Sequence, residues 1–249
     1  MITVVIPYLH SDAVWNELIL TVRSIEKYFA EEHRIILVGD KHPKLNLPVI
    51  ECELVKGFSF AKCADSINKM RCICESNEIS EEFLYWYDDI VLLKDLWLNF
   101  FETQYCLLDM ATYHNWGNSH YDQLKISTYT FLREQRLHQY NFETHLPKLF
   151  NKSKMRFMLD NLVKDNKKLL LNSLYNNFYY PGKPIELRLD DMIKGGFYGV
   201  SSPYSFGNIN NFQEVLSSKL FLNYNNRGLS DGLKKYIISR FPNKCSYER

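Results

Sequence analysis

Long apolar runs are missing from this 249-residue chain. No stretch reaches the roughly 18–20 apolar residues that a helix needs to cross a bilayer, so we expect no transmembrane segment. The opening residues, MITVVIPYL, also lack the basic start and the small-residue cleavage site of a secretory signal. These two absences predict a cytoplasmic protein.

An excess of charge of one sign is missing too. The chain has 30 Lys and Arg against 29 Asp and Glu, a formal net charge of +1, so the overall charge does not indicate the basic field of a nucleic-acid-binding protein. Two local clusters, KSKMR and KDNKK in the region of residues 152–168, leave a nucleic-acid partner open. A solvated helix face explains these clusters equally well, and we do not favour such a partner.

Paired cysteine motifs are the third absence. The six cysteines include a lone CxC at Cys72 and Cys74 but no CxxC, so the spacing of a zinc site or a redox pair is not present. Without an export signal, we expect reduced thiols. The sequence also contains no internal repeat, low-complexity tract or linker that would separate two independent domains.

Apolar and aromatic residues are abundant, at 46% and 15% of the chain. In the first half, β-branched runs alternate with segments of helical periodicity. We predict strands at 2–8, 34–40, 47–54 and 83–87, and helices at 13–29 and 59–76. This alternation indicates an α/β fold, a mostly parallel central sheet with helices on both faces. Beyond residue 100 the pattern is irregular, with helices expected at 153–178 and 231–241.

Polar residues follow three of the predicted strands. Pro7 and Tyr8 end the first, Asp40 ends the second, and Asp88 and Asp89 interrupt the apolar segment EEFLYWYDDIVLL at residues 81–93. In parallel sheets, ligands bind at the carboxyl ends of the strands. We therefore expect these residues to share one functional edge of the sheet.

The adjacent carboxylates Asp88 and Asp89 repel each other unless a cation or strong donors hold them. Mg²⁺ and Mn²⁺ are usually bound by one or two carboxylates together with substrate phosphates. An exposed turn after a strand is the alternative, because Asp is common in turns. The apolar residues on both sides of the pair favour the metal site.

With these features, the sequence resembles the GT-A glycosyltransferases. The resemblance rests on VVIPYLHSDAVWNELILTVRSIEKY, IILVGD and EFLYWYDDIVLL, where the last phrase takes the place of a metal-binding DxD motif. ETHLP, FNKSKM and the tail LNYNNRG…ISRFPNKCSYE are similar to the bacterial and phage branch related to Stealth-type capsular sugar-phosphate transferases. The resemblance to the GT-A glycosyltransferases implies a nucleotide-sugar-binding part at 1–110, and an acceptor-side and helical part of the same domain at 111–249.

The resemblance also implies roles for single residues. Pro7 and Tyr8 would line the base pocket, with the Tyr8 ring stacking on the base, and Asp40 would accept a hydrogen bond from uracil or ribose. A strict DxD has its first Asp where this chain has Tyr87. Asp89 is therefore the expected metal ligand, and Asp88 either joins it or holds sugar hydroxyls.

Residues of the predicted helix at 59–76 would meet the donor diphosphate: Asn68, Lys69 or Lys62. Each of the rim and helix residues has a plainer alternative. Tyr8 could pack locally, Asp40 could serve a turn, and a lysine could simply lie on a solvated face.

Two further segments carry candidates for proton transfer. His145 lies in an expected extended segment before Leu146 and Pro147, where it could act as base, donate to the leaving group or complete a metal shell. Glu143 is a rival base. Asp191, in the pair Asp190-Asp191, could act as base or bind acceptor hydroxyls, or it could complement a helix dipole. His114 and Trp116 are weaker candidates, the latter for sugar stacking.

These features predict a metal-dependent transferase that moves a sugar from a nucleotide-sugar donor, with UDP as the first choice, to a hydroxyl acceptor such as a glycan. Mn²⁺ or Mg²⁺ would be the cofactor. Three alternatives stay open: transfer of sugar-1-phosphate in capsule synthesis, glycosylation of a DNA base by a phage enzyme, and carbohydrate binding without catalysis.

Overall fold

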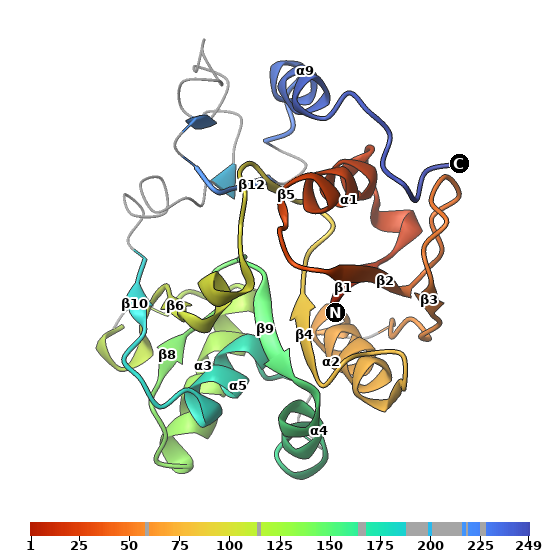
Figure 1. Ribbon diagram of the computed structural model, residues 1–249. Helices are drawn as coiled ribbons and strands as arrows, with labels where there is room; N and C mark the ends of the chain where they lie inside the picture. The colour runs from red at the N-terminus through yellow and green to blue at the C-terminus, as the bar shows by residue number, and fades with distance from the viewer. Residues whose placement is uncertain are drawn as a thin grey trace.

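The computed structural model describes residues 1–57, 60–113, 116–163, 168–187, 199–200, 216–217, 219–224 and 228–249. Its centre is a five-stranded sheet in the order β3-β2-β1-β4-β9 (Figure 1). The strands span Val49–Ile50 (β3), His33–Gly39 (β2), Ile2–Tyr8 (β1), Glu82–Tyr85 (β4) and Lys148–Asn151 (β9). The pairs β3/β2, β2/β1 and β1/β4 are parallel, and only β9 runs antiparallel. The predicted α/β class is therefore confirmed.

Helices cover both faces of this sheet (Figure 1). On one face, α1 (Glu17–Tyr28) buries Leu18, Val22 and Ile25 against the side chains of β1 and β2 that point its way. On the other face, α2 (Ala61–Glu75) and α4 (Lys152–Asn161) pack Ile67, Met70, Met155 and similar residues against the alternate side chains. Successive residues of a strand point to opposite faces, so a continuous apolar run can fill both cores.

The second half of the chain adds strands to the first. Besides β9, the strand β12 (Phe221–Tyr224) pairs antiparallel with β5 (Ile90–Leu92), which follows the acidic pair. The other elements among the described residues are short strands and helices: β6 (Tyr105–Cys106), β7 (Leu108–Asp109), β8 (Tyr140–Asn141), β10 (Ile185–Glu186), β11 (Gly199–Val200), α3 (His120–Glu134), α5 (Leu171–Tyr179) and α9 (Asp231–Arg240). Short 3₁₀ turns lie at His10–Asp12, Leu98–Glu102 and Met110–Thr112. Among the described helices, none has the length and apolar character needed to span a membrane.

Two predicted elements differ from the structure. The strand expected at 47–54 is reduced to the two residues of β3. In place of the single helix expected at 153–178 there are two helices, α4 and α5. Leu162 is the C-cap of α4, and Leu170 is the N-cap of α5. Helical periodicity continued through the connecting segment, so sequence alone could not reveal where the first helix ends.

The prediction that all cysteines are reduced is wrong for one pair. Cys52, which follows β3, forms a disulfide with Cys72 of α2. The remaining four cysteines are free. The two partners are separated by 20 residues and belong to different elements, so a search for closely spaced cysteines could not find them.

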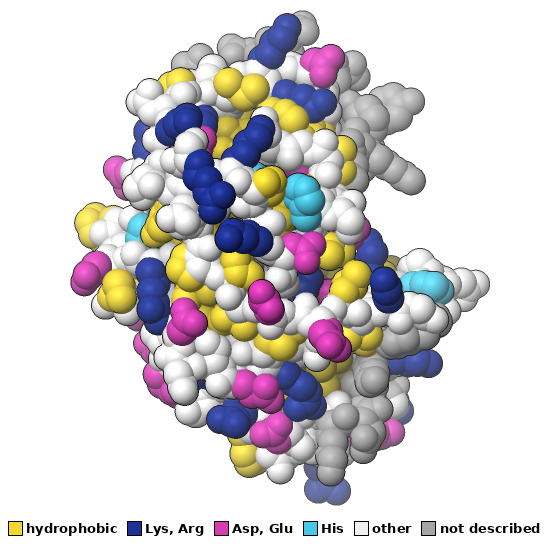
Figure 2. All heavy atoms as spheres, turned by 90° about the vertical axis from the view of Figure 1, so that its right-hand side faces the viewer, with side chains coloured by type: hydrophobic (Ala, Val, Ile, Leu, Met, Phe, Trp, Pro, Cys, Tyr) yellow, Lys and Arg dark blue, Asp and Glu magenta, His cyan; other side chains and the backbone are white. Residues whose placement is uncertain are grey.

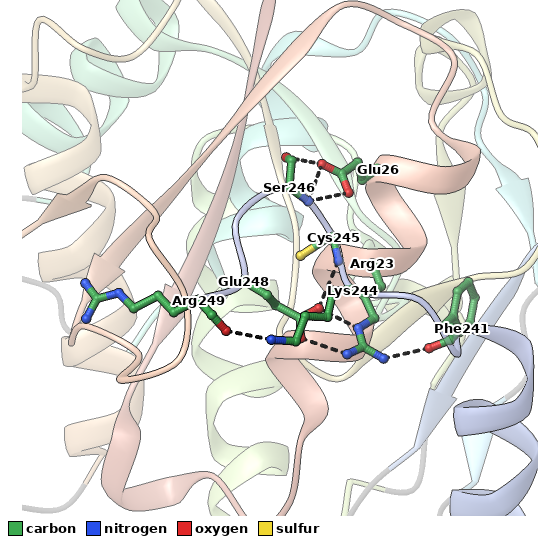
Figure 3. A network of polar contacts seen from close by, with 8 residues as sticks. All are labelled: Arg23, Glu26, Phe241, Lys244, Cys245, Ser246, Glu248 and Arg249. Carbon is green, nitrogen blue, oxygen red and sulfur yellow. Dashed lines mark hydrogen bonds and ion pairs between the residues drawn. The ribbon is translucent and has the colours of Figure 1, made fainter.

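The last residues, 241–249, form a tail that packs against α1 and the loop between β2 and β3 (Figure 3). Glu248 makes a bridge with Leu45, and the backbone N–H of Asn46 donates to the carbonyl of Tyr247 over 2.7 Å. Arg23 of α1 donates to both carboxylate oxygens of Glu248, at 2.6 and 2.7 Å. The tail is thereby fastened to α1 and to the loop between β2 and β3.

Candidate active site

The acidic pair lies in the turn that joins β4 to β5. Trp86 fixes this turn, because its backbone N–H donates to Val5 on β1 and its indole N–H donates to the carbonyl of Ile90 over 2.9 Å. From the opposite side, the Thr21 hydroxyl of α1 donates to the carbonyl of Asp88 over 2.8 Å. The carboxylates therefore project from a turn that is anchored to the sheet and to a helix.

Both carboxyl groups titrate far from their usual range. Burial, followed by repulsion from Glu17, raises the pKa of Asp88 to about 6. Burial, followed by repulsion from Asp88, raises the pKa of Asp89 to about 7. None of the ion pairs among the described residues involves either group. Among the described residues, neither carboxyl group therefore has an ion-pair partner, and a bound cation would lower both pKa values.

The predicted edge of the sheet is formed as expected for three strands. Tyr8, Asp40 and the acidic pair follow the adjacent strands β1, β2 and β4. The Asp40 carboxylate accepts from the backbone N–H of His10 over 2.8 Å. Gly39 has a φ of +110°, and a Cβ there would lie 2.5 Å from the carbonyl oxygen of Tyr8. Only glycine fits this close approach, which explains the Gly-Asp ending of β2.

Tyr8 itself is buried, with 2% of its surface exposed. Its hydroxyl is 2.8 Å from Nδ1 of His10, and its ring lies 5.6 Å from that of His42. Burial, followed by the charge of Asp88 and then of Asp40, raises the pKa of Tyr8 to about 12. The ring that the sequence predicts for base stacking is thus covered by protein. Pro7, next to it, is half-buried.

Three α2 residues are predicted to meet phosphate; Lys62 lines the cavity beside α2 described below, and the other two point in different directions. The Lys69 ammonium is buried and forms an ion pair with Asp65 over 2.9 Å, and it is close enough to Asp88 to lower the pKa of that carboxyl group. The Asn68 amide instead donates to the carbonyl of Glu53 over 2.8 Å. Lys69 therefore faces the acidic pair, whereas Asn68 fastens the segment after β3 to α2.

A cavity of about 360 Å³ opens beside the acidic turn, between α2, α3 and the start of α5; we call it the tyrosine pocket. Its lining includes Lys62, Cys63, Ser66, Met70, Tyr85, Tyr87, Tyr121, Leu124, Glu143, His145, Leu169, Leu170, Leu171 and Asn172. The Tyr87 hydroxyl accepts from the Asn172 amide over 3.0 Å. The residue at the first DxD position is therefore turned into this pocket, one residue from Asp88.

Both predicted bases, Glu143 and His145, line the tyrosine pocket. The Glu143 carboxylate accepts from the Asn172 amide and from the N–H and hydroxyl of Ser173, over 2.7–3.0 Å. Glu143 therefore caps the start of α5. Desolvation by the surrounding protein lowers the pKa of His145, and the charge of Glu143 opposes that effect.

The extended backbone predicted for His145 is wrong. Its φ is +50°, in the left-handed region. The steric restriction imposed by a proline acts on the residue directly before it, which is Leu146 and not His145. Non-glycine residues in this region are uncommon and gather at functional sites. The left-handed backbone thus places His145 in the lining of the pocket, with part of the residue exposed to solvent.

Two predicted residues, Asp191 and His114, lie outside the described residues. Trp116 packs on Tyr113 and Tyr129, with ring centroids 5.0 and 5.8 Å away. Glu17, whose charge acts on both Asp88 and Asp89, could not be singled out from the sequence, because an acidic residue at a helix start has an ordinary explanation. Asn172 could not be singled out either, because an isolated Asn belongs to no recognisable motif.

A second cavity of about 580 Å³ lies beside Asp40, lined by residues of the β2 end and the β3 segment such as Gly39, Val49 and Glu51. β3 belongs to the side of the molecule that Figure 2 faces. Basic side chains gather on the upper part of that face and acidic ones below them. A ligand that reaches from this cavity to the acidic pair would follow the carboxyl edge of the sheet.

The acidic pair meets the chemical requirements of a hard divalent cation. Two adjacent carboxylates without a cationic partner match the protein ligands that Mg²⁺ or Mn²⁺ commonly uses beside phosphate oxygens and water. Across the described parts of the chain, no three or more His, Cys, Asp and Glu side chains are arranged to hold an ion by themselves. The residues therefore fit an ion that takes its other ligands from a substrate and from water.

Comparison with known proteins identifies the fold. No protein-family model and no curated protein sequence matches the chain. Among solved structures, it is similar to the galactosyltransferase LgtC in complex with donor and acceptor sugar analogues, with 12% identity, a TM-score of 0.53 and 98% of each chain covered. It is also similar to the apo form of the bifunctional glycosyltransferase WbbM, with 12% identity, a TM-score of 0.54, and coverage of 98% of this chain and 50% of that one.

A third match is the glycosyltransferase GlyE of Streptococcus pneumoniae TIGR4, at 12% identity and a TM-score of 0.44. The alignment covers 92% of this chain and 54% of GlyE, so the chain spans about half the length of that protein. At these identities the likeness concerns the fold. The chain has the mixed α/β fold of LgtC and WbbM, with a mostly parallel central sheet.

Proposed function

We propose that this chain transfers a sugar from a nucleotide-sugar donor to a hydroxyl acceptor, with a divalent cation held at Asp88 and Asp89. The proposal rests above all on the acidic pair in the turn after β4, at the carboxyl edge of the sheet, which has no ion-pair partner among the described residues. A fold shared with LgtC and WbbM supports a glycosyltransferase. UDP is the first choice of nucleotide, because it is common in the GT-A family that the sequence resembles.

In this proposal, the cation binds the donor diphosphate and neutralises the charge that develops on it as the bond to the sugar breaks. Asp89 and Asp88 hold the cation. Lys69, which Asp65 keeps beside Asp88, adds a positive charge on the α2 side. The cavity lined by Asp40 offers room for the nucleoside.

The tyrosine pocket would receive the reacting hydroxyl group. Its aromatic walls suit the apolar face of a sugar, and its amide and carboxylate groups suit sugar hydroxyls. His145 is the favoured base because it lines the pocket and because desolvation lowers its pKa, which favours the neutral imidazole that can accept a proton. Glu143 already accepts hydrogen bonds from Asn172 and Ser173, so it is better suited to orient groups in the pocket.

The test is a donor screen with purified protein. UDP-, GDP- and CMP-sugars are incubated with Mn²⁺ and a panel of glycan acceptors, and nucleotide release is measured. Asp89→Asn should abolish Mn²⁺-dependent release, because the amide keeps the shape of the carboxylate and loses its charge. Asp95→Asn is the matched control, since Asp95 is exposed and lies beyond β5. Turnover near the wild-type level in folded Asp89→Asn would rule out the metal assignment.

The same screen separates the alternatives. Sugar-1-phosphate transfer would release the nucleoside monophosphate instead of the diphosphate. DNA glycosylation would require a DNA acceptor with hydroxylated bases. A carbohydrate-binding protein would retain glycans and release no nucleotide with any donor.

A further inference from the structure

The negative charge of the candidate site is not limited to the two residues of the motif. The side chain of Glu17 is buried at the start of α1, with the residue 7% exposed. One of its carboxylate oxygens accepts from the backbone N–H of Val14 over 3.2 Å. This hydrogen bond does not neutralise the carboxylate. No ion pair among the described residues includes Glu17.

The position of α1 directs Glu17 towards the acidic pair. Ser24 accepts from the N–H of Leu92 over 2.9 Å, and Thr21 donates to the carbonyl of Asp88 over 2.8 Å. This face of α1 therefore follows β5 towards its beginning. Glu17 precedes Thr21 by four residues, so it lies on the same face one turn further. The residues that directly precede the start of β5 are Asp88 and Asp89, so Glu17 lies next to the acidic pair.

A second observation comes from β12. Its pairing with β5 ends where Asn223 lies opposite Ile90; Tyr224 is the next residue of β12, and Asp89 directly precedes Ile90. Tyr224 is 1% exposed, and its hydroxyl has no hydrogen-bond partner among the described residues. The carboxylates that act on this hydroxyl are Glu17, Asp89 and Asp88. A buried polar group without a partner has a cost, and here it faces the acidic site.

The positions of Glu17 and Tyr224 suggest why this chain can have Tyr87 where a strict DxD motif has its first Asp. In a strict DxD, a carboxylate would stand at this position, but Tyr87 turns into the tyrosine pocket and bonds to Asn172. We infer that Glu17 of α1 is the third carboxylate of the cation site and replaces the charge that Tyr87 lacks, with the Tyr224 hydroxyl facing the same ion. This inference rests on the proposed function.

Glu17 acts on the ion through water. The three carboxylates do not converge into a ready-made site in the part of the chain that the structure describes. Mg²⁺ in particular keeps several water ligands in proteins. Glu17 and Tyr224 would therefore hold waters of the ion, whereas Asp88 and Asp89 bind it directly. Their contribution is charge and hydrogen bonding, and it should be measurable as cation affinity without turnover.

The experiment measures Mn²⁺ affinity, with and without UDP, by electron paramagnetic resonance of the free ion, together with melting temperatures in EDTA. Glu17→Gln keeps the acceptor for Val14 and loses the charge. We expect affinity to fall about tenfold or more, because a unit charge this near a divalent ion has a strong effect. In EDTA the variant should melt at a higher temperature than the wild type, because repulsion with Asp88 is relieved. Glu32→Gln, which changes an exposed carboxylate away from the site, should change neither quantity.

Further variants keep the test decisive. Glu17→Asp retains the charge and should keep most of the affinity, even if Glu17→Gln proves poorly folded. Tyr224→Phe should weaken Mn²⁺ binding about threefold or more, the scale of one hydrogen bond. Unchanged affinity in Tyr224→Phe would remove Tyr224 from the site and leave Glu17 in place.

The outcomes distinguish this inference from the function on which it rests. If the wild type binds Mn²⁺ and folded Glu17→Gln binds it equally well, the inference is overturned and the proposed function stands. If the wild type binds no Mn²⁺ with or without UDP, the metal-dependent function itself fails.

Discussion

At the scale of single residues, His145 separates a catalytic role from a structural one. Its backbone is left-handed, so His145→Ala would combine loss of the imidazole with backbone strain. Asn tolerates this region, and His145→Asn is therefore the cleaner change. If His145 is the base, turnover should fall by about 10²-fold or more, whereas the affinity for nucleotide should change far less.

The measurements are nucleotide release under saturating donor and the melting temperature of the same preparation. Glu143→Gln is the companion variant: because Glu143 caps α5, we expect it to lower stability as well as activity. A His145→Asn protein that melts earlier but turns over normally would assign the base elsewhere.

Lys148 gives a second prediction at this scale. It is 4% exposed, and burial lowers the pKa of its ammonium group to about 8, an effect that the charge of Glu143 opposes. Below about pH 8 the folded protein therefore buries a charged ammonium group, and its stability carries the full cost of that burial. As the pH rises from about 8 towards the unfolded value of 10.5, this penalty should be relieved.

Lys148→Met should consequently be more stable than the wild type at pH 7, by up to about 3 kcal/mol. The difference should shrink when urea unfolding is repeated near pH 9.5. A variant that is less stable than the wild type at pH 7 would mean that the contact of the ammonium with the carbonyl of Tyr105, at 3.4 Å, outweighs the cost of burial.

At the scale of elements, the disulfide couples the segment after β3 to α2. Asn68 and Asp65 of the same helix bond to the backbone of Glu53 and Val55, so three contacts fasten this segment beside Lys69. Removing a cross-link that closes about 20 residues should cost about 2–4 kcal/mol. We expect Cys72→Ser to unfold at a lower urea concentration than the wild type. Dithiothreitol should lower the urea concentration at which the wild type unfolds as well.

Thiol titration in urea checks the bond itself. Four thiols should react without reductant, and six should react after reduction. Cys63→Ser, which alters a free thiol on the same helix, is the control and should retain the response to dithiothreitol. Six reactive thiols in the untreated protein would contradict the disulfide.

Elements also determine how much of the site could be predicted from the sequence. β1, β2 and β4 are continuous apolar runs that end in polar residues, so the edge that carries Asp40 and Asp89 follows from local pattern and parallel order. The pairing of β5 with β12 could not be predicted, because it joins segments about 130 residues apart through a strand of four residues. The position of Glu17 next to the acidic pair depends on the packing of α1 against β5, which is also a tertiary contact. The left-handed φ of His145 likewise depends on tertiary contacts.

At the scale of the whole molecule, the C-terminal tail holds α1, the helix that carries Glu17 (Figure 3). Arg23 donates to both oxygens of Glu248 and also to the carbonyl of Phe241 over 2.7 Å. These bonds, first among them the Arg23 guanidinium, lower the pKa of Glu248 to about 2 from an ordinary value of 4.5. The ionised carboxylate therefore stabilises the folded chain.

The sign of this effect gives the last prediction. The stabilisation is fully present above about pH 4.5 and is lost as the pH falls towards 2. Glu248→Gln should destabilise the protein by about 1–3 kcal/mol at pH 7, since a charged partner of Arg23 is removed. The difference between wild type and variant in the free energy of unfolding, measured with urea, should stay constant from pH 7 to 5 and become smaller towards pH 3. Glu26→Gln, whose carboxylate is exposed and bonds Ser246 of the tail, should have a smaller effect. A difference that does not become smaller in acid would mean that the tail is held by packing and backbone bonds, with no contribution from the charge of Glu248.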